Sequence, residues 1–123
     1  MALSYGPYSP VRRSGGFLLV SGQVGINPDT KTAEVDAAKQ CKQALENMKS
    51  ALYESGADMQ DIVKTTIFLT NMGDFDAVNT VYEQFFHAPR PARSTVGVQE
   101  LPRVGGEVPL VVEIEAVAYK ELS

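Results

Sequence analysis

Residues 35–55 carry apolar side chains at the three- and four-residue spacing of an amphipathic helix. The stripe consists of Ala38, Cys41, Leu45, Met48 and Leu52. This spacing predicts a helix with one face against a core, where Cys41 is expected as a small buried side chain. Asp36 is the predicted N-cap and Gly56 the predicted stop, because these residue types suit the free backbone groups at helix ends.

A second helix is predicted over residues 74–87. Its apolar stripe, at the same spacing, consists of Phe75, Val78, Tyr82 and Phe85. We expect these side chains in the core rather than around a cofactor. His87 falls at the predicted helix end, where a solvated imidazole interacts with the helix dipole. The segment Pro89-Arg90-Pro91 then prevents the helix from continuing.

Four further segments have the short apolar runs or the alternation that favour strands. They are residues 17–24, 61–70, 93–99 and 110–119. The sequence Ser14-Gly15-Gly16 precedes the first of them and predicts a tight turn from an earlier strand. Gly22 interrupts the same segment, which indicates a β-bulge or a close backbone approach.

The predicted elements follow the order strand, strand, helix, strand, helix, strand, strand. This order favours an α+β or mixed α/β fold in which two helices cover one face of a sheet. The chain has 123 residues and contains no segment with the composition of a linker. Residues 1–123 are therefore expected to form a single domain.

Alternation divides the last predicted strand into an apolar face and a mixed face. The apolar face consists of Leu110, Val112, Ile114, Ala116 and Ala118, and the mixed face of Val111, Glu113, Glu115, Val117 and Tyr119. We expect the apolar face under the helices. Arg93 alternates with Val96 and Val98 in its own strand, so we expect it to project with Glu113 from the side away from the helices. The two form either a structural ion pair or part of an interface between copies of the chain.

Composition removes most catalytic chemistries. One histidine and one cysteine cannot form a zinc site of the usual kind, and no nucleophile-elbow motif accompanies His87. The formal net charge of −4 argues against nucleic acid as a partner, since phosphate binding requires clustered basic residues. The single cysteine excludes an internal disulfide and favours a cytoplasmic location. The apolar runs are too short for a membrane span.

Several segments, taken together in their order, resemble one protein family. They are Gly6-Pro7-Tyr8, Ser21-Gly22-Gln23, residues 61–66, residues 78–86, Pro91-Ala92-Arg93-Ser94 and residues 112–116. With these motifs the chain resembles the RidA (YjgF) family of enamine/imine deaminases over nearly its whole length. The Pro-Ala-Arg-Ser motif followed by the strand sequence Glu-Ile-Glu-Ala is the most specific part of the resemblance.

The resemblance implies a chorismate-mutase-like α+β fold of the bacillary type, assembled as a homotrimer with clefts between subunits. It implies hydrolysis of 2-aminoacrylate or 2-aminocrotonate, through their imine tautomers, to 2-oxo acids and ammonia. Dehydratases that use pyridoxal phosphate produce these intermediates, whereas the family itself needs no cofactor. The partners implied are small 2-imino and 2-oxo acids and further copies of the chain.

The resemblance also implies residue roles. Arg93 is expected to bind the substrate carboxylate through two parallel hydrogen bonds, and Glu113 to position or activate water. Thr95 stands two residues after the arginine, where many members have cysteine, and its backbone groups can act whatever the side chain. The positions expected to line the cleft are Tyr8, Ser21, Gly22 and Asn79, with Tyr8 coming from a neighbouring subunit.

These positions also have plain structural interpretations. Tyr8 could cap the sheet edge, Asn79 could face solvent from mid-helix, and Ser21 could form a local hydrogen bond. Glu115 could be the functional acid or an interface residue, because it shares a face with Glu113.

Two departures from the family pattern leave the preferred substrate open. Residues 104–109 form a longer connection than usual, and the segment between Phe86 and Pro91 is shorter, with Arg90 where phenylalanine is common. Arg90 adds positive charge near Arg93, which favours dianionic or larger acids. The rival functions are a non-catalytic trimer that binds small carboxylates and an endoribonuclease or translation inhibitor, which the net charge disfavours.

Overall fold

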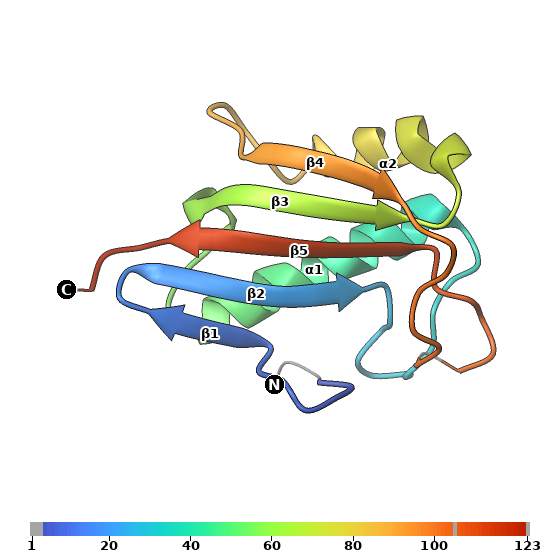
Figure 1. The fold of residues 1–123 in the computed structure, drawn as a ribbon, viewed down its shortest axis with the longest axis horizontal. Coiled ribbons are helices and arrows are strands. Elements are labelled where there is room, and N and C mark those ends of the chain that lie inside the picture. The colour runs from blue at the N-terminus through green and yellow to red at the C-terminus, as the bar shows by residue number, and fades with distance from the viewer. Residues whose placement is uncertain (1–3, 105, 123) are drawn as a thin grey trace.

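The computed structural model describes residues 4–104 and 106–122 (Figure 1). Its strands are β1 (Val11–Ser14), β2 (Phe17–Val24), β3 (Ile62–Leu69), β4 (Ala92–Gly97) and β5 (Val112–Tyr119). Its helices are α1 (Ala37–Glu54) and α2 (Phe75–Tyr82), and single 3₁₀ turns, Met59–Asp61 and Met72–Asp74, precede β3 and α2. The predicted order of strands and helices is confirmed.

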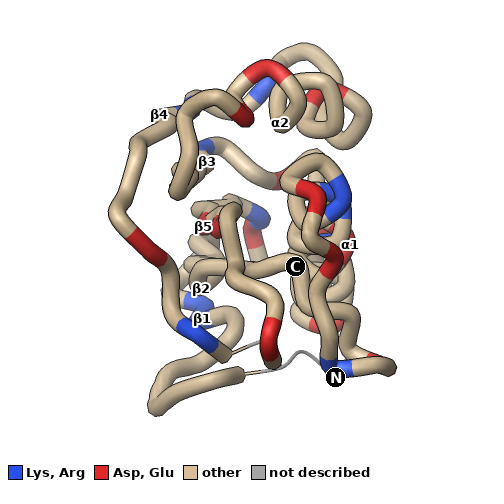
Figure 2. The backbone as a smooth tube through the Cα atoms, turned by 90° about the vertical axis from the view of Figure 1, so that its right-hand side faces the viewer, with Lys and Arg blue, Asp and Glu red and all other residues tan. Residues whose placement is uncertain are grey.

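The five strands form one mixed sheet in the order β1-β2-β5-β3-β4. The β3–β4 pair is parallel and the other pairs are antiparallel. Both helices lie on one side of this sheet, with α1 behind its central strands and α2 beside β4 at one edge (Figure 1, Figure 2). This arrangement confirms the predicted α+β fold with two helices on one face.

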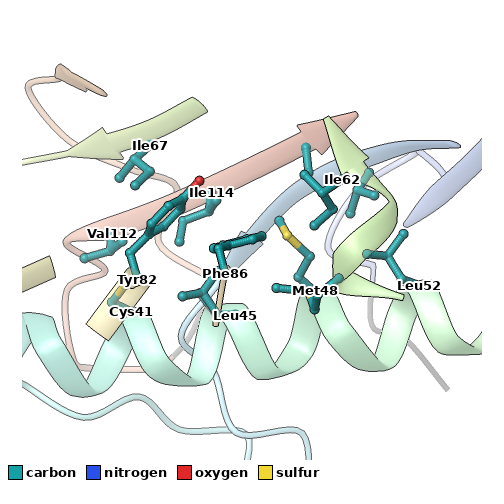
Figure 3. Close-up of a cluster of buried hydrophobic side chains, with 14 of the residues drawn as sticks. Cys41, Leu45, Met48, Leu52, Ile62, Ile67, Tyr82, Phe86, Val112 and Ile114 are labelled. Atoms are coloured by element: carbon teal, nitrogen blue, oxygen red, sulfur yellow. The ribbon is translucent and has the colours of Figure 1, made fainter. Parts of the chain in front are cut away.

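The core lies between the helices and the side of the sheet that faces them, here called the helix face. On β5 this face is formed by Val112, Ile114, Ala116 and Ala118. The other side of the sheet is called the open face. Helix α1 presents its apolar stripe to the core, as predicted, and Cys41 is fully buried within that stripe (Figure 3). Apolar burial of this kind stabilises the fold by roughly 1.5–3 kcal/mol for each large side chain.

Helix α1 begins and stops as the sequence predicts. The Asp36 carboxylate accepts a hydrogen bond from the backbone N–H of Lys39 at 3.0 Å. Gly56 lies just beyond the helix with a φ of +84°, a conformation that favours glycine.

Helix α2 is shorter than predicted. It ends at Tyr82, and the backbone N–H groups of Gln84 and Phe85 donate to carbonyl oxygens only three residues earlier, which tightens the chain into turns. Phe86 then turns into the core, where its ring centroid lies 4.4 Å from that of Tyr82. The prediction of a helix to residue 87 was wrong, and His87 lies beyond the helix instead of at its end.

Strand β2 contains the irregularity that Gly22 predicted, because its register against β5 shifts between Val20 and Gln23. The tight turn before β2 is also confirmed, with Gly15 at a φ of +58°. The longer connection over residues 104–109 includes Gly105, which lies outside the described residues.

Candidate functional site

Arg93 lies on β4, at the sheet edge beside α2. Its Nη2 donates a hydrogen bond to Asn79 Oδ1 at 2.7 Å. The guanidinium carbon lies 4.8 Å from the ring centroid of Tyr82 and 5.6 Å from that of Phe75. Helical spacing explains how α2 supplies all three neighbours, because positions four and seven residues apart lie on one side of a helix.

Much of the Arg93 guanidinium remains available to a ligand. In the described part of the chain no carboxylate forms an ion pair with it, and Nη2 is its only nitrogen with a hydrogen-bond partner. The contacts with the Tyr82 and Phe75 rings are cation–π contacts, so they give the remaining N–H donors no conventional hydrogen-bond acceptor. The arrangement can therefore hold a planar carboxylate through parallel hydrogen bonds.

Arg93 and Glu113 lie on opposite faces of the sheet. Arg93 is in register with Thr65, which is fully buried and hydrogen-bonded to Tyr82 of α2, so Arg93 belongs to the helix face. Glu113 alternates with the buried residues of β5 and belongs to the open face. The prediction that Arg93 and Glu113 project from one face was wrong. Within one chain the two residues cannot form the ion pair that the sequence left open.

The error has a physical cause. Alternation relates residues within one strand, but it does not say how two strands that are not neighbours are set against each other. Strand β3 lies between β4 and β5. Phe68 of β3 is paired with Val96 of β4 on one side and with Glu113 of β5 on the other, so all three residues lie on the open face. Arg93 alternates with Val96 and therefore lies on the helix face.

Glu113 packs directly on the backbone of Gly22, at the bulge of β2. A Cβ added at Gly22 would lie 2.7 Å from Glu113 Cδ and closer still to Oε2, so a larger residue there would displace the carboxyl. Burial raises the pKa of Glu113, and the neighbouring Glu115 raises it further. A carboxyl with a raised pKa is suited to passing protons. Glu115, on the same face, is exposed.

Ser21 and Tyr8 lie beside the β2 bulge. Ser21 Oγ donates to the carbonyl oxygen of Ser9, twelve residues earlier, at 2.6 Å. Its proton is therefore used within the chain, but not in a local bond. Its oxygen can still accept a hydrogen bond. Tyr8 is about half exposed. A hollow of about 440 Å³ lies between these residues, lined by Pro7, Tyr8, Ser9, Arg12, Leu19, Val20 and Ser21.

The structure thus divides the predicted site residues into two groups. The first group lies on the helix face at the β4 edge and contains Arg93, Asn79 and Thr95, the last in register with the buried Ile67. The second group is built around the β2 bulge and contains Glu113, Gly22, Ser21 and Tyr8.

The thiol of Cys41 has no features of a catalytic cysteine. Burial raises the pKa of Cys41 to about 12, against an opposing effect of Arg93, so its thiol is neutral and unreactive. Residues 4–104 and 106–122 hold no cluster of three or more His, Cys, Asp or Glu side chains suited to a metal ion. Within the same residues no helix has the length and apolar character needed to cross a membrane.

A family model described as endoribonuclease L-PSP matches residues 1–120. The chain belongs to this family, also called YjgF/RidA. The resemblance inferred from the motifs is therefore confirmed.

Relatives within the RidA family include proteins with an enzyme name. The chain is 43% identical over 117 residues to the 2-iminobutanoate/2-iminopropanoate deaminase of Dermatophagoides farinae, which covers 94% of this chain and 88% of that protein. It is 40% identical over 118 residues to the protein of the same name from Escherichia coli K12, with the same coverage. A crystal structure of E. coli TdcF with bound serine is 36% identical, with a TM-score of 0.87 over 96% of this chain and 91% of that one.

Sequence reasoning missed the aromatic neighbours of Arg93. Helical spacing predicts both Phe75 and Tyr82 in the core. Tyr82 is buried there, as predicted, but Phe75 is 36% exposed, and both rings contact the guanidinium. One signal in the sequence could have indicated these contacts. Asn79, a predicted cleft residue, lies four residues after Phe75 and three before Tyr82, so all three share one side of the predicted helix.

Proposed function

We propose that this RidA-family protein is a hydrolase that converts 2-imino acids, the tautomers of 2-aminoacrylate and 2-aminocrotonate, to 2-oxo acids and ammonia. Two proteins named as such deaminases are 43% and 40% identical to it. The observation that carries the proposal is the setting of Arg93. Helix α2 holds its guanidinium by an amide and two rings, while no described carboxylate neutralises it.

The active site is proposed to form between copies of the chain in a homotrimer. Arg93 and Glu113 lie on opposite faces of one sheet, so a single substrate can meet both only if a second copy supplies one of them. The open face also carries exposed apolar side chains, including Leu19, Val96 and Tyr119, whose burial would favour assembly.

In this site the substrate carboxylate binds Arg93. This contact holds the imine carbon in a fixed position relative to the residues of the neighbouring copy. Asn79 keeps the guanidinium in place through its hydrogen bond to Nη2. Thr95 follows on the same side of β4, where its hydroxyl and backbone groups can contact the bound acid. Ser21, Gly22 and Tyr8 line the opposite wall.

Glu113 is proposed to transfer the protons. It accepts a proton from water as the oxygen adds to the imine carbon, and it delivers that proton to the nitrogen. In the resulting carbinolamine the hydroxyl proton passes through Glu113 to the amine nitrogen as the C–N bond breaks, so ammonia leaves and the oxygen becomes the carbonyl of the 2-oxo acid. No electrons are transferred to or from the substrate, so the step needs no redox cofactor. The raised pKa of Glu113 suits both directions of transfer.

The cellular role proposed is removal of reactive imines released by cytoplasmic dehydratases that use pyridoxal phosphate. The test adds the protein to a threonine dehydratase reaction and follows 2-oxobutanoate. We expect faster release of the 2-oxo acid than from spontaneous hydrolysis. No acceleration by a folded, assembled sample would rule out deamination of this substrate.

Two variants connect the assay to the site. Arg93→Ala should lower kcat/KM by roughly a hundredfold or more, because the carboxylate loses a two-point, charge-assisted contact. Tyr53→Phe is the matched control, since Tyr53 is 81% exposed on α1 and should leave the rate unchanged. Equal rates for Arg93→Ala and the parent protein would contradict the carboxylate-binding role.

A second candidate is a trimer that binds small carboxylates without catalysis, a function that would use Arg93 but would not need Glu113. Glu113→Gln distinguishes the two functions, since it should abolish hydrolysis and leave binding of 2-oxobutanoate intact. The family model's description raises ribonuclease activity as well. We expect no RNA cleavage, because acidic and basic residues are interspersed along the chain and the net charge is −4 (Figure 2).

A further inference from the structure

The ring of Tyr82 contacts two flat groups. Its centroid is 4.4 Å from that of Phe86, with an angle of 34° between the rings, and 4.8 Å from the guanidinium carbon of Arg93. Both groups therefore lie within contact distance of the Tyr82 ring. Figure 3 shows Tyr82 and Phe86 side by side between α1 and the sheet, with the Tyr82 hydroxyl toward the strands.

The hydroxyl of Tyr82 is fixed as well. Its Oη lies 2.7 Å from Thr65 Oγ1, in a hydrogen bond that either oxygen could donate. Tyr82 is 5% exposed and Thr65 is fully buried, so neither hydroxyl has water as a ready alternative. A buried hydroxyl without a partner is costly, which strongly favours the bonded arrangement.

This bond joins two elements at the position of Arg93. Thr65 belongs to β3 and is in register with Arg93 on β4, while Tyr82 belongs to α2. A core made for packing alone would accept phenylalanine and valine here, since these residues have nearly the same shapes and no polar atoms to satisfy. The hydroxyl pair instead ties the ring that contacts the guanidinium to β3.

We infer that the buried Thr65–Tyr82 hydroxyl pair is a positioning element for Arg93, which holds the ring of Tyr82 in the plane that orients the guanidinium for two-point binding of a carboxylate. This inference rests on the carboxylate-binding role proposed above for Arg93. Asn79 fixes one nitrogen of the guanidinium and the ring fixes its plane, so together they leave little freedom to rotate. Carboxylate binding then requires little further ordering of the side chain.

The test uses the double variant Thr65→Val/Tyr82→Phe in the full-length, assembled protein. Removing both hydroxyls together leaves no orphaned polar group, so the fold is expected to survive. Tyr53→Phe again serves as the control for loss of an exposed hydroxyl. The first readout is the NMR signal of the Arg93 Nη groups, which are separate when rotation of the guanidinium is slow and merge when it is fast.

We expect separate Nη signals in the parent protein and in Tyr53→Phe, and merged signals in the double variant. The second readout is the Kd for 2-oxobutanoate, which we expect to rise roughly tenfold in the double variant. In an Arg93→Lys background the same double substitution should leave Kd unchanged, because lysine offers no plane to orient. A purely structural role would lower affinity in both backgrounds alike.

Unchanged Nη signals in the double variant would overturn the inference, as would an equal loss of affinity in the arginine and lysine backgrounds. Should the double variant not fold, Tyr82→Phe alone is measured in the same way, with the same two outcomes. Failure of the proposed function has a different result: the parent protein would not accelerate release of the 2-oxo acid in the dehydratase assay. The Nη signals report the orientation of Arg93 without any turnover.

Discussion

Arg93 and Glu113 lie on opposite faces of the same five-stranded sheet. Arg93 is directed toward α2, where Asn79 and two rings hold it, and Glu113 packs on Gly22 at the bulge of β2. The strands β5 and β3 separate the bulge from β4, so one copy of the chain presents the two halves of the site in different directions. The proposed chemistry therefore depends on assembly.

Complementation tests this dependence. Arg93→Ala and Glu113→Gln should each be inactive alone, because each removes one half of every site. Subunits of the two variants, mixed during refolding, should form sites that have an intact arginine from one chain and an intact glutamate from the other. A restored site needs an intact Arg93 from one subunit and an intact Glu113 from the next. With equal, random mixing, about a quarter of the sites in a cyclic assembly meet both conditions. Activity that stays at the level of the single variants after mixing would place both residues in one chain's site.

Gly22→Ala should uncouple binding from catalysis. The added Cβ would occupy the space of the Glu113 carboxyl, so we expect a lower kcat with little change in the Kd for 2-oxobutanoate. The crowding should also lower the free energy of unfolding by about 1–3 kcal/mol. Enzyme assays, calorimetric titration and urea unfolding measure the three quantities. A parent-like kcat in a folded Gly22→Ala protein would show that the carboxyl position does not matter.

The stability of the protein should depend on the ionisation of Glu113. Burial and Glu115 raise the pKa of Glu113 in the folded chain, so folding favours its protonated form. This contribution is present below the pKa of the unfolded chain and is lost as pH rises through the folded pKa. Glu113→Gln should therefore gain stability relative to the parent protein as pH rises above the ordinary glutamate pKa of about 4.3.

Urea unfolding at several pH values and one fixed protein concentration measures this difference. Glu115→Gln is the matched comparison. It should lower the pKa of Glu113 toward its ordinary value, and so reduce the pH dependence without abolishing it. A difference between Glu113→Gln and the parent protein that is constant with pH would contradict the raised pKa.

Gln40 should be among the polar residues on which stability depends most. Its side chain is fully buried on α1, donates to the carbonyl oxygens of Glu34 and Pro109, and accepts from the backbone N–H of Val111. Gln40→Met would leave three backbone groups without these partners, so we expect a loss of about 2–4 kcal/mol in the free energy of unfolding. Gln60→Met, at an exposed position, should cost little in the same urea experiment.

Local pattern was sufficient for much of the fold. The apolar stripe of α1, its cap at Asp36 and the bulge at Gly22 all follow from spacing and residue type within short segments. The end of α2 did not follow, because the turns after Tyr82 are favoured by the burial of Phe86 against that ring, a contact that spacing does not reveal.

Helical and strand periodicities are local, so the elements, their order and the residue types available for chemistry can be predicted from the chain alone. That Arg93 faces α2, while Glu113 faces away from both helices, follows only from how the strands pair. The reason is that β3 pairs with both β4 and β5, and the register of these two pairings decides which residues of β4 and β5 share a face. Alternation decides this only for residues of one strand. The hydroxyl pair beneath Arg93 likewise exists only because β3 and α2 meet at that position.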